Sequence, residues 1–394
     1  MMRFCLPAFA MLGCRQALLL CILFSFANGS TIFGQDNKQS NSENASSDPK
    51  KEEDDPFAIP QDASVKELFT WIIKVKRTPP PRDAVAETAQ KLFPAIIQAC
   101  DLVLEKSDDN ADITKALEEK FSAYGILVRY LPSARKDLDV LANKYASDSR
   151  PEIAQVAVGH QLMQKAESVR NATAEETQLI SDSTIEFLDR FGATRNTFST
   201  ASRIASSLGY SEHTEIAAVL HEAMAKQLEK SDDKDLRKRS AKMLGAARRI
   251  RLPGNEMQLT GVTANGEPFE WTTYRGKVVL VDFWASWCGP CIAEIPNMKR
   301  NLERYGEKGF VIVGINMDEK RPAFEKCVED KEITWVNIVS EEEGKTGWDA
   351  PIADYYGISG IPTAILVDQQ GKVVSLHARG IELDKHLEQL LGTE

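Results

Sequence analysis

The sequence predicts two folded parts of different class, an all-α domain over residues 59–251 and an α/β domain over residues 252–394. Through the first part, apolar residues recur at helical spacing, without the alternation typical of strands. From Leu252–Gly254 onward that spacing stops, and short runs rich in β-branched residues begin. A chain of 394 residues is also too long for one typical domain. We therefore expect a domain boundary near residue 252.

Residues 1–27 are expected to be a secretory signal rather than part of the fold. Arg3 and Arg15 precede an uninterrupted apolar run of about eleven residues, which is too short to cross a bilayer comfortably. Ser25 and Ala27 then supply the small residues of a cleavage site. We expect an extracytoplasmic protein, in a bacterial periplasm or secreted. An uncleaved signal would instead leave it tethered to a membrane.

Residues 28–58 are predicted to be a disordered linker. They are rich in Ser, Asn, Asp, Glu and Lys, and they lack apolar periodicity. Such a segment cannot bury enough apolar surface to offset the entropy lost on ordering. Its function would be to extend the reach of the domains that follow.

The all-α domain is interpreted as eight or nine helices joined by short loops, hence as antiparallel neighbours. Plausible N-caps include Ser133, Thr173 and Ser231. The expected helical segments begin near residue 65 and continue at 85–104, 111–130, 133–146, 151–168, 174–191, 195–208, 212–229 and 233–250. Periodicity reports burial and not function. A partner-binding or dimerising module and a spacer with a packed core are therefore equally open.

Charge and ligand spacing argue against two classes of function. The net charge is −10, and no stripe rich in Lys and Arg is evident, so we expect no nucleic acid partner. His160, His213 and His221 lie in the all-α domain without a Cys, Asp or His that completes a metal-ligand spacing. We expect no metal and no other cofactor.

Seven cysteines are present, and three of them lie in the expected signal. The remaining four are too few for a disulfide-stapled scaffold in a chain of this size. Cys100 falls in an apolar helix pattern, and Cys327 follows Phe324 by three residues in another, so both are expected to be buried, inert thiols. A redox relay through Cys327 is a minor alternative.

Cys288 and Cys291 form a C-x-x-C pair between a predicted strand, 278–284, and a predicted helix, 292–305. A zinc site would need a second pair of cysteines, which the chain lacks. The N-terminus of a helix carries partial positive charge, which stabilises a thiolate at the first cysteine. We assign Cys288 as the nucleophile that attacks a substrate disulfide. Cys291, one turn into the helix and more buried, would then resolve the mixed disulfide.

Residues around the pair are candidates for supporting roles. Gly289 leaves access for a substrate, and Pro290 fits the first turn of the helix. Trp287 is expected to line the substrate face, whereas Trp284 is expected to pack in the core. Asp282 lies inside the apolar strand, where burial would raise its pKa and make it a proton acceptor near neutrality. An outward-facing strand aspartate is the alternative.

The segment YRGKVVLVDFWASWCGPC at 274–291 and the segment FVIVGINMDE at 310–319 resemble the thioredoxin superfamily, and within it the extracytoplasmic TlpA/ResA-like thiol–disulfide oxidoreductases. The resemblance covers the chain from about Gly254 to its end and leaves the all-α domain outside. It implies a thioredoxin fold, with a central mixed sheet flanked by helices and an added N-terminal β-hairpin. Asn265-Gly266 would form the turn of that hairpin.

The resemblance also implies roles for individual residues. Asp282 corresponds to the buried acid that helps deprotonate the second cysteine, although many TlpA-like proteins have Asn there. Glu294 matches a glutamate that tunes ResA-like reductases; an ordinary first-turn Glu is equally open. Pro362 corresponds to a cis proline that faces the C-x-x-C pair. The backbone of Ile361 would pair with an extended substrate.

The implied activity is that of an exported oxidoreductase that reduces protein disulfides and is re-reduced by a membrane electron donor. The Gly-Pro spacer favours the reducing direction, because it resembles thioredoxin, at about −270 mV, more than the strong oxidants at about −120 mV. A thiol peroxidase is an alternative on the same fold, although the Thr-x-x-C context is missing before Cys288. Another is a helical scaffold whose thioredoxin domain only docks partners; the intact Cys288, Cys291, Asp282 and Pro362 argue against it.

Overall fold

The computed structural model describes residues 55–78, 81, 83–209, 211–340, 342 and 344–392. The expected signal and most of the expected linker lie outside these residues. Of the linker, residues 55–58 are described. Phe57 packs against a cluster of buried apolar residues that lie between positions 63 and 134. Among the described helices, none combines the length and the apolar character needed to cross a membrane.

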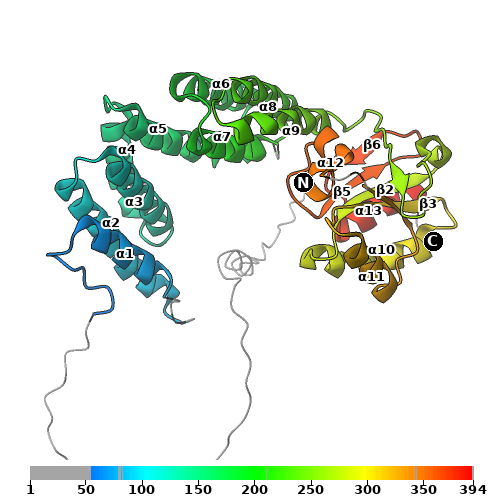
Figure 1. Cartoon of the computed structure of the whole chain (residues 1–394), viewed down its shortest axis with the longest axis horizontal. Helices are drawn as coiled ribbons and strands as arrows, with labels where there is room; N and C mark the ends of the chain where they lie inside the picture. The colour runs from blue at the N-terminus through cyan, green and yellow to red at the C-terminus, as the bar shows by residue number, and fades with distance from the viewer. Residues whose placement is uncertain are drawn as a thin grey trace, which may run out of the picture. The chain divides into compact units, whose positions relative to one another are not determined.

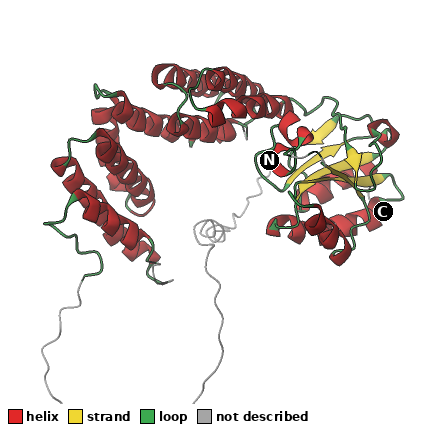
Figure 2. Ribbon diagram, viewed as in Figure 1, coloured by secondary structure: helices red, strands yellow, loops and turns green. Residues whose placement is uncertain are grey.

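The first described part of the chain is helical, as predicted (Figures 1 and 2). Its described residues form the helices α1 (Val65–Lys76), α2 (Val85–Lys106), α3 (Asn110–Tyr130), α4 (Arg135–Ala146), α5 (Pro151–Ala166), α6 (Ala174–Phe191), α7 (Arg195–Leu208), α8 (Thr214–Glu229) and α9 (Lys234–Ile250). Among the described residues of this part, the 3-10 helices are η1 (Pro132–Ala134) and η2 (Val169–Asn171); η3 (Trp271–Tyr274) and η4 (Gly347–Asp349) lie in the second part.

The helix starts show where local sequence signals succeed and fail. Thr173 caps α6 as predicted, because its side chain accepts the Glu176 N–H in a capping box. The other two predicted caps are wrong. Ser133 lies within η1, and α4 begins after it. Asp233 and not Ser231 caps α9, because its carboxylate accepts two N–H groups of the first turn.

The two unpaired cysteines differ in burial. Cys100 is fully buried in α2, and burial raises the pKa of its thiol to about 12, so it is the inert core residue that was expected. Cys327, by contrast, is half-buried on α11 (Arg321–Asp330) and packs at the edge of the core, so the expectation of full burial is wrong there. Burial still raises the pKa of the Cys327 thiol.

The second part contains a six-stranded mixed sheet, which confirms the predicted fold class (Figure 2). The strand order is β1-β4-β3-β2-β5-β6, with β2, β3 and β4 parallel and the other pairs antiparallel. The strands are β1 (Val262–Thr263), β2 (Val278–Trp284), β3 (Phe310–Asn316), β4 (Val336–Val339), β5 (Thr363–Val367) and β6 (Val373–Ser375). All seven residues of β2 are buried, as expected for a central strand.

The helices α10 (Gly289–Tyr305) and α11 connect β2, β3 and β4 by crossovers that progress in one direction across the sheet. Because such crossovers are right-handed, α10 and α11 cover the same face. The helix α13 (Ile381–Leu391) packs against α10 on that face (Figure 1). The short helix α12 (Pro351–Tyr355) packs instead against α9 of the all-α domain.

The added hairpin is present in a shorter form than predicted. Gly266 has a φ of 83°, and the Thr263 N–H donates to the Glu267 carbonyl at 2.8 Å, so Asn265-Gly266 does form the turn. Among the described residues, the two arms of the hairpin are joined by a single β-bridge, between Val262 and Pro268. The arms stay short because β1 pairs with β4 along its other edge and the 3-10 helix η3 begins at Trp271.

A close contact of two glycines joins α9 to α12. A Cβ on Gly245 would lie 2.4 Å from the Asp354 carbonyl oxygen, and a Cβ on Gly357 would lie 2.2 Å from the Ala246 nitrogen. Arg249 Nη1 donates to the carbonyls of Tyr356, at 2.7 Å, and Gly357, at 2.6 Å. We call this contact the glycine seam. Residues from Asp55 onward accordingly form one compact unit.

The glycine seam predicts a stability effect with an internal control. Gly245→Ala should lower the free energy of unfolding by about 1–3 kcal/mol, because its methyl group meets backbone that cannot rotate away. Gly125→Ala in α3 is the matched change, since a Cβ there has no other atom within 4 Å. It should stabilise the helix by about 0.5–1 kcal/mol. Urea unfolding of both variants measures the difference, and equal effects would contradict the close approach.

Candidate active site

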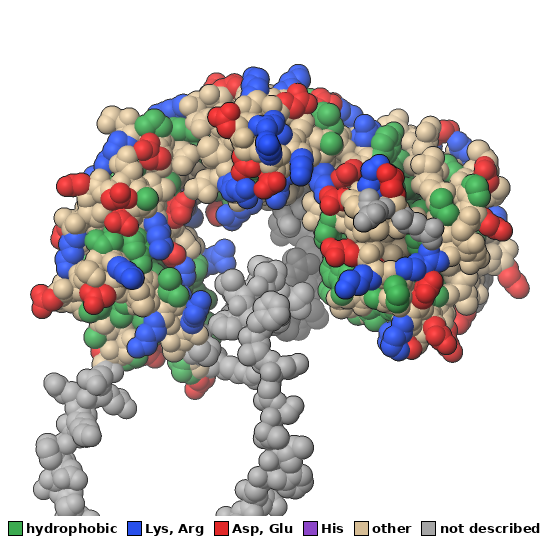
Figure 3. Space-filling view, in the orientation of Figure 1, with side chains coloured by type: hydrophobic (Ala, Val, Ile, Leu, Met, Phe, Trp, Pro, Cys, Tyr) green, Lys and Arg blue, Asp and Glu red, His purple; other side chains and the backbone are tan. Residues whose placement is uncertain are grey.

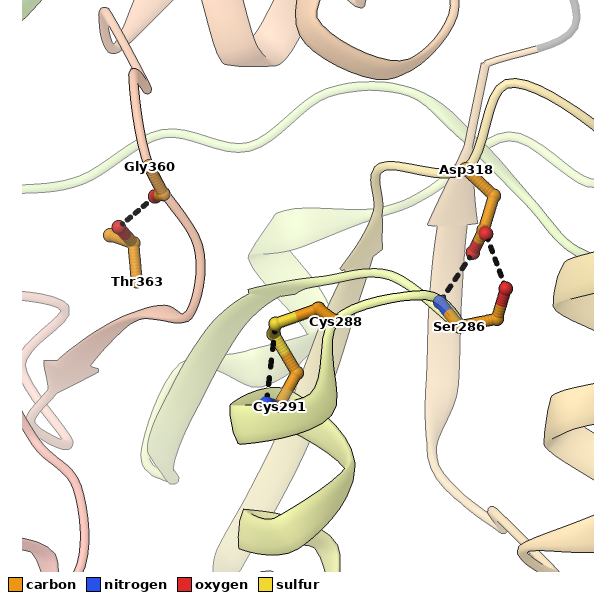
Figure 4. The surroundings of a disulfide bond; sticks show 6 residues. All are labelled: Ser286, Cys288, Cys291, Asp318, Gly360 and Thr363. Atoms are coloured by element: carbon orange, nitrogen blue, oxygen red, sulfur yellow. Dashed lines mark hydrogen bonds between the residues drawn. A yellow bond between two sulfur atoms is a disulfide. The ribbon is translucent and has the colours of Figure 1, made fainter. Parts of the chain in front are cut away.

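The two cysteines lie where β2 ends and α10 begins. Cys288 is the N-cap of α10, and its Sγ accepts the Cys291 N–H at 3.2 Å. The two residues are joined by a disulfide, with their Cα atoms 5.2 Å apart (Figure 4). Cys288 is 5% exposed and Cys291 2%. Both are therefore buried, and the expected difference in exposure between them is small.

The loop before the cysteines is fixed by an acid that sequence reasoning did not identify. The Ser286 N–H and Oγ donate to the Asp318 carboxylate at 3.0 and 2.6 Å (Figure 4). Asn316 Nδ2 donates to the same carboxylate at 2.7 Å. Asp318 is buried just after β3, so these bonds tie the Cys288 loop to the neighbouring strand. Asp318 is the aspartate of the segment FVIVGINMDE at 310–319. That segment indicates the family, but it does not indicate the bond to Ser286.

This anchor predicts graded losses of stability. Asp318→Ala leaves the half-buried Ser286 N–H and the buried Asn316 amide without their acceptor, and an unpaired buried group such as the Asn316 amide costs about 1–3 kcal/mol. Ser286→Ala removes only the hydroxyl bond and should cost about 1 kcal/mol. Thermal unfolding of the oxidised variants compares them. If the Asp318→Ala variant unfolds at the wild-type temperature, the hydrogen bonds of Asp318 do not stabilise the fold.

Asp282 is buried in the middle of β2, with only 4% of its surface exposed, so it is not an outward-facing strand residue. Its neighbours in register are small, Gly314 on β3 and Ala364 on β5. Burial raises the pKa of Asp282 to about 7; the Arg379 guanidinium opposes this rise and the Glu294 carboxylate adds to it. The carboxyl group thus titrates near neutrality.

Glu294 does more than an ordinary first-turn glutamate. Its Oε1 accepts the Gly380 N–H at 2.7 Å and the Asn297 Nδ2 at 2.7 Å. Gly380 is the N-cap of α13, so Glu294 joins α10 to the start of the last helix. The preceding residue, Arg379, has a buried Nε without a hydrogen-bond partner. Sequence reasoning missed Arg379, because no local pattern connects it to a strand almost a hundred residues earlier.

The side chains around the cysteines divide into exposed and buried ones. Trp287 is 57% exposed, and its ring centroid lies 6.2 Å from that of Trp348. Gly289 and Pro290 are exposed as well, and a Cβ on Gly289 would meet open space. Trp284, by contrast, is buried against Phe324, and its Nε1 donates to Asn337 Oδ1 at 2.9 Å. Trp284 therefore packs in the core.

The Ile361–Pro362 peptide bond is cis, as the resemblance implied. Thr363 pairs with Phe283 near the end of β2, so this turn lies at the same end of the sheet as the cysteine loop. Figure 4 shows Gly360 and Thr363 on the turn facing the disulfide, with the Thr363 hydroxyl donating to the Gly360 carbonyl at 2.8 Å. Ile361 and Pro362 are both half-buried, which leaves part of each accessible.

The histidines of the all-α domain have structural surroundings. His160 stacks on Phe121 with ring centroids 4.5 Å apart, and His221 Nδ1 lies 2.7 Å from the Ala217 carbonyl oxygen. His213 is the N-cap residue of α8. Over the described part of the chain, no group of three or more His, Cys, Asp or Glu side chains is placed to hold a metal ion.

Comparison with known proteins identifies the family. A family profile described as Redoxin matches residues 249–391. The ResA thiol–disulfide oxidoreductase of Bacillus thuringiensis subsp. konkukian is 31% identical over 126 residues, which are 32% of this chain and 68% of that protein. The chain belongs to the ResA family of thiol–disulfide oxidoreductases. The resemblance predicted from the motifs is thereby confirmed.

Other ResA proteins match the same part of the chain. That of Geobacillus thermodenitrificans is 29% identical over 128 residues, 32% of this chain and 70% of the relative. That of Bacillus subtilis is 29% identical over 112 residues, 28% of this chain and 59% of the relative. The Redoxin match begins at residue 249, so all of the all-α domain except its last residues lies outside it.

Two solved structures were also found to be similar. One is the thioredoxin domain of a thiol–disulfide oxidoreductase from Bacteroides vulgatus, 28% identical, with a TM-score of 0.33, covering 35% of this chain and 97% of that domain. The other is a thiol:disulfide interchange protein of Chlorobium tepidum, 28% identical, with a TM-score of 0.30, covering 36% of this chain and 97% of that one.

Proposed function

We propose that this ResA-family chain reduces disulfide bonds of proteins outside the cytoplasm through Cys288 and Cys291. The contact between Cys288 Sγ and the Cys291 N–H, at the N-terminus of a 17-residue helix, carries the proposal. Once the disulfide is reduced, that N–H and the helix dipole stabilise negative charge on Cys288. Cys288 is therefore the thiol that is ready to act as a nucleophile.

The reaction needs no group beyond the two thiols and a base. The Cys288 thiolate attacks one sulfur of the substrate disulfide, which breaks and leaves the other sulfur as a thiolate that takes up a proton. Cys291 then loses its proton, attacks Cys288 Sγ and releases the second substrate thiol. Two electrons pass to the substrate, and the enzyme ends as the Cys288–Cys291 disulfide.

Asp282 is the base that we assign to the second step. Its pKa of about 7 lets its carboxylate accept the Cys291 proton near neutral pH. Glu294 and Arg379 act on it through charge, in opposite directions. Glu294 is thus a positioning and tuning residue, because it also fixes the start of α13 next to Arg379.

The substrate face consists of exposed groups around the cysteine loop. Trp287 provides an apolar surface, while Gly289 and Pro290 leave the approach to Cys288 open. Ile361, next to the cis Pro362, offers main-chain groups to which an extended substrate segment can hydrogen-bond, as in strand addition. Strand addition suits many sequences, because the main chain is common to all of them.

The location and the electron source are inferred from sequence pattern and redox chemistry. Residues 1–27 have the pattern of a secretory signal, which supports a site of action outside the cytoplasm. Glutathione and thioredoxin of the cytoplasm are then out of reach, so a dithiol carried by a membrane protein would re-reduce the pair.

The reduction potential of the Cys288–Cys291 pair tests the direction of the reaction. Equilibration of the mature protein with dithiothreitol is expected to give about −270 mV, as for reducing thioredoxins with the same Gly-Pro spacer. The oxidised and reduced fractions can be counted by mass after thiol alkylation. A potential near −120 mV would mean that the pair forms disulfides and does not reduce them.

A further inference from the structure

Three adjoining cavities run along the all-α domain. The first, of about 420 Å³, lies between α3, α5 and α7, and the second, of about 630 Å³, between α5, α7 and α9. These two share Met163, Ser199 and Arg203 in their walls. The third, of about 680 Å³, lies between α9 and residues 348–359, and it shares Arg195 and Arg239 with the second. We call this continuous depression the helical groove.

The middle of the helical groove is cationic. The charged side chains that line its second cavity are all arginines, namely Arg195, Arg203 and Arg239. Arg195 pairs with Asp233, the N-cap of α9, and with Asp235 in its first turn. Arg203 makes no ion pair with any described residue. The helix α9 carries seven Lys or Arg and one Asp, so the expectation that the chain has no basic stripe is wrong. Figure 3 shows Lys and Arg side chains gathered over α7 and α9.

Three polar groups in the walls of the groove lack hydrogen-bond partners. His160 Nε2 and Gln164 Nε2 in the first cavity, and Ser202 Oγ in the second, are buried and unpaired. Buried polar groups normally have a partner. These three atoms are closed to solvent, so a bound polypeptide would meet them only after their side chains turn into the groove. An extended polypeptide then offers one N–H and one C=O per residue along its length. Burial lowers the pKa of His160 to about 4, so its ring enters such bonds uncharged.

The third cavity leads to the cysteines. Trp348 lines it, and the ring of Trp348 lies 6.2 Å from that of Trp287, the neighbour of Cys288. Ile358 and Ser359 line it too, just before the cis Ile361–Pro362 bond. A polypeptide whose disulfide is at Cys288 would enter the groove past Trp348. Charged side chains of both signs line this third cavity, so the cationic second cavity is the part that selects for acidic residues; the third cavity's charged lining residues are Arg195, Asp235, Lys238, Arg239, Lys242, Asp349 and Asp354.

We infer that the helical groove binds an extended, acidic segment of the protein substrate that flanks the disulfide to be reduced. The inference rests on the proposed function and deepens it, because it names the substrate class as acidic polypeptides. The cationic second cavity in a chain of net charge −10 attracts such a segment, and the unpaired groups hold its main chain. This gives the all-α domain a role in choosing substrates.

Two model substrates test the inference with the full mature chain. Each is a peptide with one internal disulfide, followed either by six residues of Asp and Glu or by six of Asn and Gln. We expect kcat/KM to be about tenfold higher for the acidic peptide at low salt, and the ratio to fall towards one at 0.5 M salt. The variant Arg203→Gln/Lys238→Gln/Arg239→Gln should lower the ratio to about one. The matched variant Lys226→Gln/Lys230→Gln/Lys234→Gln changes the net charge equally, outside the groove, and should keep it.

Other outcomes separate the two proposals. A ratio near one in the wild-type chain, or an unchanged ratio in the groove variant, would overturn the inference while leaving the reductase function in place. If neither peptide is reduced, the proposed function fails, and the groove is tested alone by fluorescence anisotropy with a labelled acidic peptide that lacks cysteine. Groove-dependent binding to anionic lipid vesicles without any binding to that peptide would also overturn the inference, because the partner would then be a membrane.

Discussion

Replacing Cys291 with serine should turn the protein into a trap for its substrates. Cys288 keeps its place at the N-cap of α10 and can still attack a disulfide. Without the Cys291 thiol the mixed disulfide is not resolved, so turnover should fall by about a thousandfold or more. Non-reducing electrophoresis and mass spectrometry of the adducts would show one substrate thiol covalently bound per enzyme molecule.

Cys288→Ser provides the matched control. This variant lacks the nucleophile and retains the buried resolving thiol, so it should form no adduct and have no activity. Trapping by the Cys288→Ser variant, with none by the Cys291→Ser variant, would reverse the roles that we assign to the two cysteines.

Asp282→Asn should slow the reaction and stabilise the fold. Loss of a general base costs about a hundredfold or more in the step that it serves, here the release of the mixed disulfide. The wild-type rate of release should rise with pH through about 7, as the Asp282 carboxylate forms, and the Asp282→Asn variant should lose that rise. Stopped-flow measurements of product release between about pH 5.5 and 8.5 give both profiles.

The effect of Asp282 on stability has the opposite sign to its effect on rate. Its pKa is about 7 in the folded chain and about 3.9 in an unfolded one, so the folded state binds more protons between these values. Wild-type stability should therefore fall as the pH rises from about 4 to 7, by about 4 kcal/mol from this group. The gain in stability on Asp282→Asn should grow over that range and level off above it. A gain that is equal at pH 5 and pH 8 would contradict the raised pKa.

Sequence alone predicted the parts of the site that depend on local order. The apolar strand 278–284 and the helix after it place Cys288 at a helix start, because neighbours in sequence determine where a helix begins. Pro362 was predicted from family resemblance, and its cis bond was confirmed. Burial of Asp282 followed from the run of apolar residues on both sides of it.

The contacts that were missed all join distant segments. Asp318 holds Ser286 across 32 residues, and Glu294 holds Gly380 across 86. Periodicity reports which face of an element is buried but not which element covers it, so neither bond could be inferred. The basic helix α9 was missed for a different reason: its charge disappears in the net value of −10 for the whole chain.

The glycine seam affects how the two halves of this chain can be recombined. Tyr356 and Gly357 rely on Arg249 for their carbonyl hydrogen bonds, and Trp348 relies on Lys242. If the chain were cut after α9 and the catalytic half isolated, these three carbonyl groups would have only water as a hydrogen-bond partner. A chimaera that joined these helices to another oxidoreductase would need a glycine opposite Gly245, since any larger residue would clash with its backbone. The halves are therefore not interchangeable modules, and a substitution on either side of the seam limits what the other side can tolerate.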